Sequence, residues 1–459
     1  METRAAQQEN VRFVLTGGDV TVVKSTFPSW RGAYAGRVPR RPPRSSLGLE
    51  FVDTVVDSPS LGMVADSVRK DLAQAAVGRG DPVLVLFLAH YLGKATLEAP
   101  ELLRPRLRAM LVGWEIEELT STLIEELSGA DVLLGISDFN TSVFARAFPG
   151  TPAITVPVCP PLPSKAEPDR ALWGLPEGTI VFLNVFNTVS GFDRKNPIDV
   201  HEAFRRAFPD RDDVRLVFKV HGGFDKNPDE GELTGEESRA AEFLARCAAD
   251  DRVILVDEQL DYKTVLSLVS SCDVYVSLAR AEGLGLPVLE AMALGVPTVA
   301  MDYAGHGDFV RPGSNVLVPY DVVEIGDDAS HYYHPREYPT RPVWAQPRLD
   351  DAAQLLRELA DDPELRLRVG EAGRVAARDF ERRCAESTWV HDLEAALSSP
   401  GVRAAHPDRD AAFRAVVDRD RAMWLEHERV VRRARRNLRW RTRLGRVKRT
   451  LLGWPRRSV

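Results

Sequence analysis

The sequence predicts two α/β lobes followed by a helical, basic C-terminal tail. Three observations support this fold class. Apolar runs alternate with amphipathic segments of helical period, a Pro-rich stretch divides these runs into two groups, and the last segment is rich in Arg. Near-continuous apolar runs are typical of strands buried on both faces of a parallel sheet, so each lobe should be doubly wound.

The alternation is clearest in the second half of the chain. The run IVFLNVF (180–186) predicts a strand, and Asn196 as N-cap with Pro197 in the first turn predicts the start of a helix. The elements expected after it are strands at 214–220, 253–256, 274–278 and 298–301, helices at 236–247, 262–271, 288–294 and from 350 to about 397, and an irregular segment at 335–347.

The first half repeats the pattern less clearly. Strands are expected at 49–56, 83–89, 109–113, 132–136 and 153–156, with helices at 63–76, 115–127 and 143–147. The basic, Pro-rich residues 31–46 predict a mobile loop, and the Pro-rich residues 159–168 predict a linker. The resulting domains are a partly mobile extension (1–46), a first lobe (47–163), a second lobe with C-terminal helices (164–398) and a basic amphipathic tail (399–459).

Composition excludes several classes of protein. The chain has 459 residues, of which 44% are hydrophobic and 28% charged, which excludes disorder as the main state and a disulfide-rich scaffold. The apolar run at 83–89 is far shorter than the about 20 residues of a membrane span, and the polar start predicts no signal peptide. The four cysteines lie far apart, as expected for reduced thiols. We therefore expect a cytoplasmic protein.

The charge is unevenly distributed. Residues 429–459 contain thirteen Lys or Arg and no acid, and removing these cations from the net charge of −7 leaves the rest of the chain at −20. An acidic body of this kind repels nucleic acid. We therefore expect no nucleic-acid partner.

The segment AEGLGLPVLEAMALGVPTVAMD (281–302) has the features of a ligand site. Its glycines allow close approach of the backbone, and Pro287 begins a helix whose N-terminus offers free N–H groups. Glu282 in the loop and Glu290 near the first turn can accept hydrogen bonds from sugar hydroxyls. The alternative is a capping acid and a surface Glu on an ordinary helix.

Arg194 and Lys195 directly precede the expected helix start at Asn196. Their cations and the free N–H groups of that helix would converge on one anion site. The alternative, two solvated bases, is disfavoured because a helix N-terminus prefers acids.

Several stretches resemble one family. E-x7-E followed by A-M-A-x-G-x-P-x-V resembles the donor-site signature of the retaining glycosyltransferases of family 4 (group 1), which have the GT-B fold of two Rossmann-like lobes. FNTVSGFDRKNPIDVHEAFRRAF (186–208) is similar to the segment after the first strand of the family's donor lobe. NVLVPY (315–320) and VWAQP (343–347) resemble the branch of this family found in surface-polysaccharide gene products. In the first half of the chain, VGWEIEEL (112–119) also resembles family members.

The resemblance implies an acceptor-side first lobe, a nucleotide-sugar donor lobe and the residues that bind the donor. Glu290 would bind the ribose, Glu282 the donor sugar, and Arg194 with Lys195 the pyrophosphate. The residues expected to bind the donor are Arg194, Lys195, Glu282, Gly283, Leu284, Gly285, Leu286 and Glu290. No metal or other cofactor is expected, because these cations and helix dipoles carry the positive charge.

Glu282, Lys195 and His90 are the expected catalytic residues. His90 follows the strand expected at 83–89, where α/β ligand sites lie, and a structural histidine is the alternative. The sequence also departs from the family, since residues 187–191 lack the Arg that many relatives carry about five residues before the Lys.

The resemblance implies transfer of a sugar, with hexosyl transfer expected, from a nucleotide-diphosphate donor to a glycan or lipid-linked hydroxyl. The configuration would be retained, and the product would belong to cell-surface polysaccharide or glycolipid. The alternative is a non-catalytic scaffold or membrane-docking subunit on a degenerate transferase fold. The intact Glu282 and Glu290 argue against that alternative, and the weak patterning of the first lobe argues for it.

The tail has the pattern of a basic amphipathic helix. Val417, Trp424, Val431 and Leu438 recur every seven residues among many arginines. Such a helix suits an anionic membrane surface, so we expect docking on the inner face of the plasma membrane. The same spacing allows a coiled coil, so homo-oligomerisation is the alternative.

Overall fold

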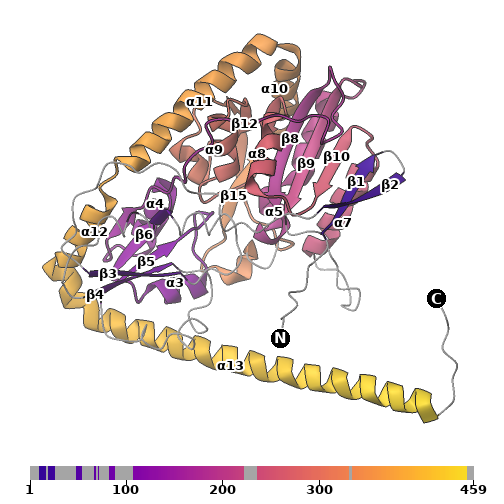
Figure 1. Ribbon diagram of the computed structural model, residues 1–459. Helices are drawn as coiled ribbons and strands as arrows, with labels where there is room; N and C mark the ends of the chain where they lie inside the picture. Colours follow the sequence, from indigo (N-terminus) through magenta and orange to yellow (C-terminus); the bar gives the residue numbers. More distant parts are fainter. Residues whose placement is uncertain are drawn as a thin grey trace, which may run out of the picture.

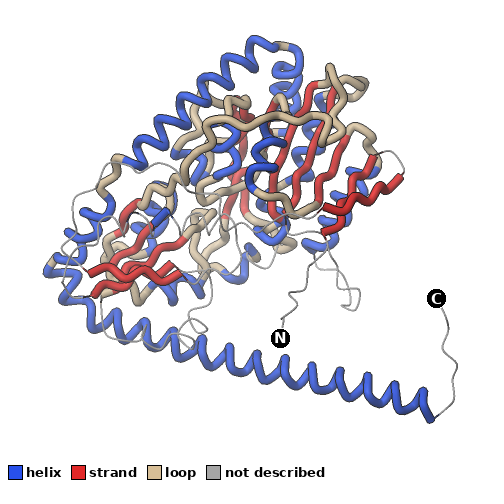
Figure 2. Tube along the Cα trace, in the orientation of Figure 1, coloured by secondary structure: helices blue, strands red, loops and turns tan. Residues whose placement is uncertain are grey.

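The computed structural model describes residues 10–16, 19–25, 48–53, 67–68, 71, 82–87, 107–221, 235–329 and 333–451. Within these residues the strands form two main sheets and one two-stranded ribbon. Helices surround the sheets, and Figures 1 and 2 show the two lobes side by side. The loop predicted at 31–46 and the candidate His90 lie outside the described residues.

The first lobe contains a five-stranded parallel sheet in the order β3-β4-β5-β6-β7. Its elements are β3 (Gly48–Asp53), β4 (Pro82–Phe87), β5 (Arg108–Val112), α3 (Ser121–Leu127), β6 (Val132–Gly135), α4 (Asp138–Ala147) and β7 (Ala153–Thr155). All five strands were predicted close to these bounds. The helix predicted at 115–127 begins only at Ser121, because the side chain of Thr120 caps it by accepting from the Leu123 N–H. The residues before Thr120 form a loop instead.

The second lobe contains an eight-stranded sheet in the order β13-β12-β11-β8-β9-β10-β1-β2. Its strands are β1 (Asn10–Thr16), β2 (Asp19–Ser25), β8 (Ile180–Asn187), β9 (Val214–His221), β10 (Val253–Asp257), β11 (Val274–Val276), β12 (Thr298–Ala300) and β13 (Val316–Leu317). The strands from β13 to β10 are parallel, as expected. β1 and β2 were not predicted. They form a hairpin whose first strand pairs antiparallel with β10, so part of the predicted extension (1–46) completes the second sheet.

The longer helices of the second lobe follow the prediction closely, and they are α6 (Pro197–Ala207), α7 (Gly235–Ala248), α8 (Tyr262–Ser270) and α9 (Leu286–Ala293). The short helix α5 (Phe192–Lys195) and the 3-10 helix η3 (Ala304–Asp308) were not predicted. A cluster of phenylalanine rings fixes α5. The Phe192 ring lies 5.8 Å from that of Phe186 and 5.7 Å from that of Phe243, edge to face. Such ring pairs contribute about 0.5–1.5 kcal/mol beyond their buried area. The cluster therefore holds the helix that carries Arg194 and Lys195.

Asn196 does not cap α6 through its side chain, which corrects the prediction. Its backbone is left-handed, with φ 56° and ψ 45°, and its side-chain amide donates to the carbonyl of Leu278 at 3.0 Å. Asn is one of the few residues that adopt this conformation readily. The residue therefore turns the chain between α5 and α6 and ties this turn to the end of β11.

The segment predicted as irregular at 335–347 is partly a strand. β15 (Val343–Pro347) pairs antiparallel with β14 (Tyr320–Glu324). Its prolines hid this strand from the sequence pattern. Proline is tolerated in a strand of this kind because an edge strand does not need every N–H group.

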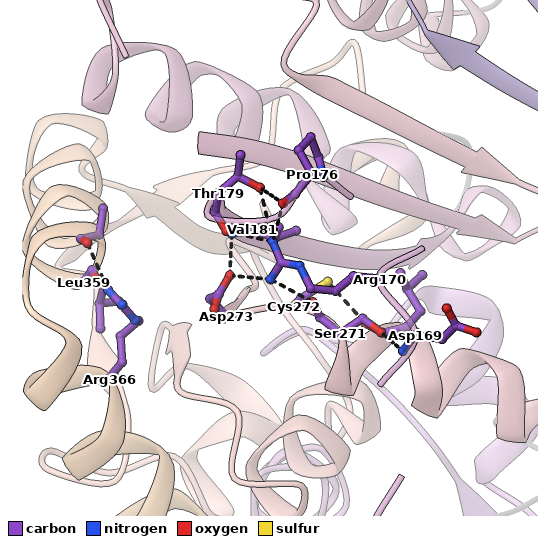
Figure 3. A network of polar contacts seen from close by, with 12 residues as sticks. Asp169, Arg170, Pro176, Thr179, Val181, Ser271, Cys272, Asp273, Leu359 and Arg366 are labelled. Carbon is purple, nitrogen blue, oxygen red and sulfur yellow. Dashed lines mark hydrogen bonds and ion pairs between the residues drawn. The ribbon is translucent and has the colours of Figure 1, made fainter. Parts of the chain in front are cut away.

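Among the described residues the chain crosses between the lobes at the linker and again before the last two helices, and hydrogen bonds hold the linker to the second lobe. In the linker, Arg378 donates to the carbonyl of Leu162 at 3.2 Å, and Glu381 accepts from the Leu162 N–H at 2.9 Å. Figure 3 shows how Arg170, just beyond the linker, bonds the carbonyl of Thr179 and the carboxylate of Asp273. The second crossing follows the long helix that carries Arg378. The C-terminal helices are α10 (Leu349–Asp361), α11 (Pro363–Ala385), α12 (Trp389–Ser398) and α13 (Pro400–Leu451).

The first turns of α13 belong to the first lobe rather than to a separate tail. α12 packs on β6 and β7, and α13 packs on α3. Arg108 forms an ion pair with Asp410 at 2.5 Å, and Phe413 and Val417 are fully buried. The tail predicted from residue 399 is therefore part of the folded body up to Val417. Figure 1 shows α13 continuing from there as one helix past the lobe. No helix in the described part of the chain is long and apolar enough to span a membrane.

We expect Phe413→Ala to lower the free energy of unfolding by about 3–5 kcal/mol, because a fully buried aromatic ring leaves a cavity. Leu425→Ala, on the same helix but with 47% of Leu425 exposed, should change it by less than about 0.5 kcal/mol. Urea denaturation followed by circular dichroism measures both. Equal effects of the two substitutions would show that α13 does not pack on the first lobe.

Candidate active site

The loop between β11 and α9 needs glycine at Gly285 and has a tight contact at Gly283. Gly285 has φ 95°, and a Cβ atom there would lie 2.3 Å from the ring of His306. A Cβ atom on Gly283 would lie 3.2 Å from the carbonyl oxygen of Trp114 in the first lobe. The loop backbone therefore packs closely against its own lobe and against the opposite one.

Helix α9 begins directly after this loop, with Pro287 in its first turn and no side chain capping its N-terminus. The side chains of Leu284 and Leu286 are buried in the core. Only the backbone of these residues can face a ligand, as the predicted role of residues 283–286 requires. Free N–H groups at a helix N-terminus favour an anion such as a phosphate.

Glu282, at the start of the loop, is a half-buried carboxylate, with 12% of its side chain exposed, and two cations hold it. Its Oε1 lies 2.5 Å from Nζ of Lys195, and its Oε2 lies 3.0 Å from Nη1 of Arg194. Burial acts to raise the pKa of Glu282, but the two cations outweigh it and hold the pKa at about 2. Glu282 is therefore a fixed negative charge at neutral pH. The structure thus brings together three of the predicted site residues.

The two cations differ in what they can reach. Arg194 has only 3% of its side chain exposed, and it donates to the carbonyls of Ser190 and Ala281 as well as to Glu282. Lys195 keeps 15% exposure, and Glu282 is its only acceptor among the described residues. Burial lowers the pKa of Lys195, although Glu282 opposes this shift. The geometry favours Lys195 as the cation that meets a ligand and Arg194 as the one that orients Glu282.

Glu290, one turn into α9, has a different environment. Its carboxylate is buried and accepts from the hydroxyl of Tyr262, on α8, at 2.8 Å. Burial raises the pKa of Glu290 to about 7, although the Tyr262 hydrogen bond opposes the shift. The sequence pattern indicated Glu290. It did not indicate that Tyr262, the first residue of the helix expected at 262–271, donates a hydrogen bond to Glu290.

The first lobe also contributes a residue to the charged cluster of Arg194, Lys195 and Glu282. The sequence did not predict this contribution. Glu115 follows β5, and its Oε1 lies 3.7 Å from Nη2 of Arg194. The hydroxyl of Tyr333, from the second lobe, donates to the other oxygen of Glu115 at 3.3 Å. The position of Glu115 after a parallel strand was the available signal, because ligand sites lie at the carboxyl ends of such strands.

These groups can stabilise an anion and hold a polyol. Lys195 and the N-terminus of α9 supply positive charge, while Glu282 and Glu290 supply hydrogen-bond acceptors. Among the residues that the structure describes, no group of three or more His, Cys, Asp or Glu has the geometry of a metal site.

Comparison with known proteins connects this geometry to a family. Residues 168–343 match the family model described as Glycosyl transferases group 1. The matched segment includes Arg194, Lys195, Glu282 and Glu290 but not Glu115 of the first lobe.

Two curated relatives are similar to longer parts of the chain. Over 281 residues the chain is 25% identical to the GDP-mannose-dependent monoacylated alpha-(1-6)-phosphatidylinositol monomannoside mannosyltransferase of Corynebacterium glutamicum. This match covers 57% of the chain and 62% of the relative's length. Over 352 residues the chain is 26% identical to the alpha-maltose-1-phosphate synthase of Mycobacterium tuberculosis, covering 72% of the chain and 81% of that synthase.

The fold has counterparts among solved structures. The crystal structure of Anabaena Alr3699/HepE in complex with UDP and glucose covers 76% of this chain and 100% of its own, with a TM-score of 0.51 and 13% identity. At this identity the similarity concerns the fold alone, and it agrees with the expected arrangement of two α/β lobes. Residues 168–343 therefore match the glycosyl transferases group 1 family, and this matched segment contains the signature around Glu282 and Glu290.

Proposed function

We propose that this protein is a retaining glycosyltransferase that moves a hexose from a nucleotide-diphosphate donor to a hydroxyl group. The observation that carries the proposal is the half-buried Glu282 carboxylate, held by Lys195 and Arg194 beside the N-terminus of α9, which no side chain caps. A departing diphosphate needs the cation and the helix N-terminus, and a positively charged sugar needs the fixed carboxylate. The family match over residues 168–343 supports the same chemistry.

In the proposed reaction the acceptor oxygen attacks the anomeric carbon on the face that the leaving group departs from. The bond between that carbon and the diphosphate oxygen breaks, and the departing diphosphate takes the proton of the acceptor hydroxyl. Lys195 stabilises the growing negative charge, and Glu282 orients the sugar and stabilises its positive charge. Glu290, supported by Tyr262, accepts from the ribose hydroxyls. Because Lys195 and α9 supply positive charge, we expect turnover without a divalent metal.

The acceptor class follows from the relatives and from the tail. The name of the Corynebacterium relative states a phosphatidylinositol monomannoside substrate. We therefore propose a lipid-linked or glycan acceptor, in cell-surface polysaccharide or glycolipid synthesis. The protein would act in the cytoplasm with the basic end of α13 docked on the inner face of the plasma membrane, because residues 429–459 carry thirteen Lys or Arg and no acid.

Incubation of the purified full chain with UDP- and GDP-sugars, with and without cell-envelope lipid, tests the activity. Transfer to the lipid, or slow hydrolysis of one donor in its absence, is expected. Neither transfer nor hydrolysis, from a protein that still binds membrane, would support the alternative of a non-catalytic docking subunit.

Glu290→Gln should weaken nucleotide binding by about 1.5–3 kcal/mol above neutral pH, since a neutral amide replaces a charge-assisted acceptor. The pKa of Glu290 is about 7, so the affinity of the unaltered protein should rise as the pH increases through that value and the carboxyl ionises. The variant should lack this rise. Calorimetric titration with UDP and GDP measures it, and Glu364→Gln, at an exposed position, is the control. Parallel pH profiles would exclude the ribose role.

Lys195→Ala should lower kcat by on the order of a hundredfold while nucleotide affinity changes less, because charge on the diphosphate grows in the transition state. Steady-state kinetics with the active donor separates kcat from KM. Lys165→Ala removes a Lys whose side chain is 85% exposed and should change neither. A higher KM with constant kcat would contradict the proposed role of Lys195.

Removal of residues 430–459 should abolish binding to vesicles that contain phosphatidylglycerol, while the packing of Phe413 and Val417 stays intact. Near the headgroups each base contributes about 1 kcal/mol, so binding of the full chain should weaken as salt increases. Cosedimentation measures both proteins. If they sediment equally, another surface binds the membrane. If the full chain forms a salt-independent dimer and stays in solution, the coiled-coil alternative is correct.

A further inference from the structure

The loop of the first lobe that contains Trp114 is fixed against the donor loop, which is the loop between β11 and α9 of the second lobe. The side chain of Asn140, on α4, accepts from the Trp114 N–H at 3.3 Å and donates to the Trp114 carbonyl. Asn140 is fully buried, so the core of the first lobe sets the position of the Trp114 peptide. That peptide packs on Gly283 of the second lobe, and the next residue is Glu115.

Arg194 lies between two carboxylates that come from different lobes. Glu282 accepts from Nη1, and Glu115 lies 3.7 Å from Nη2. The hydroxyl of Tyr333 orients Glu115, and the Arg194 guanidinium lies 5.8 Å from the Tyr333 ring. All other polar partners of this guanidinium are carbonyls of its own lobe. Glu115 is therefore the one contact of Arg194 across the lobes among the described residues.

We propose that Glu115 is a positioning residue of the transferase, acting through Arg194 on Glu282. When the lobes meet, Glu115 completes the partners of a buried cation, and that cation then orients the catalytic carboxylate. When the lobes part, the Arg194 guanidinium loses its ion pair with Glu115. Its hydrogen bond with Glu282 is then held less firmly in one geometry. Closure of the lobes is thereby coupled to assembly of the donor site. The catalytic part of this inference rests on the proposed function.

The chain offers a matched control on the same loop. Glu117 also bonds the second lobe, accepting from the hydroxyl of Tyr303 at 3.2 Å, and the structure gives it no ion pair with Arg194. Glu115→Gln and Glu117→Gln therefore remove the same charge from the same loop, and each leaves an oxygen that can accept from its Tyr hydroxyl, but only Glu115→Gln removes a charge beside Arg194. Tyr333→Phe removes the hydroxyl that orients Glu115 without changing any charge, and it replaces Glu115→Gln if that variant fails to fold.

Hydrogen exchange of the nucleotide-free full chain is the first test. Peptides covering residues 280–290 should exchange faster in Glu115→Gln and in Tyr333→Phe than in the unaltered protein, and Glu117→Gln should leave them unchanged. Equal exchange in all four proteins, or equal acceleration by the two Gln substitutions, would overturn the proposal. This result does not depend on whether the protein is a transferase.

Kinetics is the second test. Glu115→Gln should lower kcat by on the order of tenfold to a hundredfold, since a small misplacement of a catalytic group is costly. Its affinity for UDP or GDP should change by less than about threefold, because the contact acts in the transition state. Weaker nucleotide binding at constant kcat would overturn the positioning role. If the unaltered protein neither binds nor turns over any nucleotide sugar, the proposed function fails, while the exchange result still decides the contact between the lobes.

Discussion

The pairing of the half-buried Glu282 carboxylate with Lys195 and Arg194 is the interaction on which the rest of the site depends. An unpaired carboxylate at this burial would be strongly destabilising, so the fold must bring cations to it. Both cations come from the single turn of α5, which the ring of Phe192 anchors and the left-handed Asn196 ends. Gly285 is needed on the other side, because a side chain there would collide with His306. The aromatic packing, the special backbone conformations and the charges therefore serve one arrangement.

The two acids of the E-x7-E motif show how environment separates identical side chains. Burial acts to raise the pKa of both, yet only Glu282 has cations beside it. Its pKa falls to about 2, while that of Glu290, whose partner among the described residues is the hydroxyl of Tyr262, rises to about 7. One acid is thus a permanent charge suited to a cationic sugar. The other is an acceptor whose charge changes near neutral pH, which suits neutral hydroxyl groups.

Contacts between the lobes make the first lobe part of this electrostatic arrangement. Glu115 and the Trp114 peptide meet the donor loop directly, and α12 with the first turns of α13 packs back on the first lobe. The α11 segment also holds the linker near Leu162. The chain therefore connects the lobes at its middle and near its end, and the charged cluster lies where the two lobes touch.

The sequence by itself determined where most of the parallel strands lie along the chain, because near-continuous apolar runs identify buried parallel strands without reference to neighbours. It also indicated Arg194, Lys195, Glu282 and Glu290, because glycines, a proline and charged residues mark a helix start locally. Local signals could not identify β15, where prolines obscure an edge strand, or the side-chain partner of Asn196.

Only the tertiary structure decided which charges meet. Glu115 and Arg194 are far apart in the chain, and their contact depends on how the two lobes pack. The same holds for Val417, whose place in the seven-residue repeat suggested a membrane face until its burial assigned it to the first lobe. The physical reason is common to both. The period of a pattern shows that a side chain needs a partner, whereas the identity of that partner depends on contacts between segments distant in sequence.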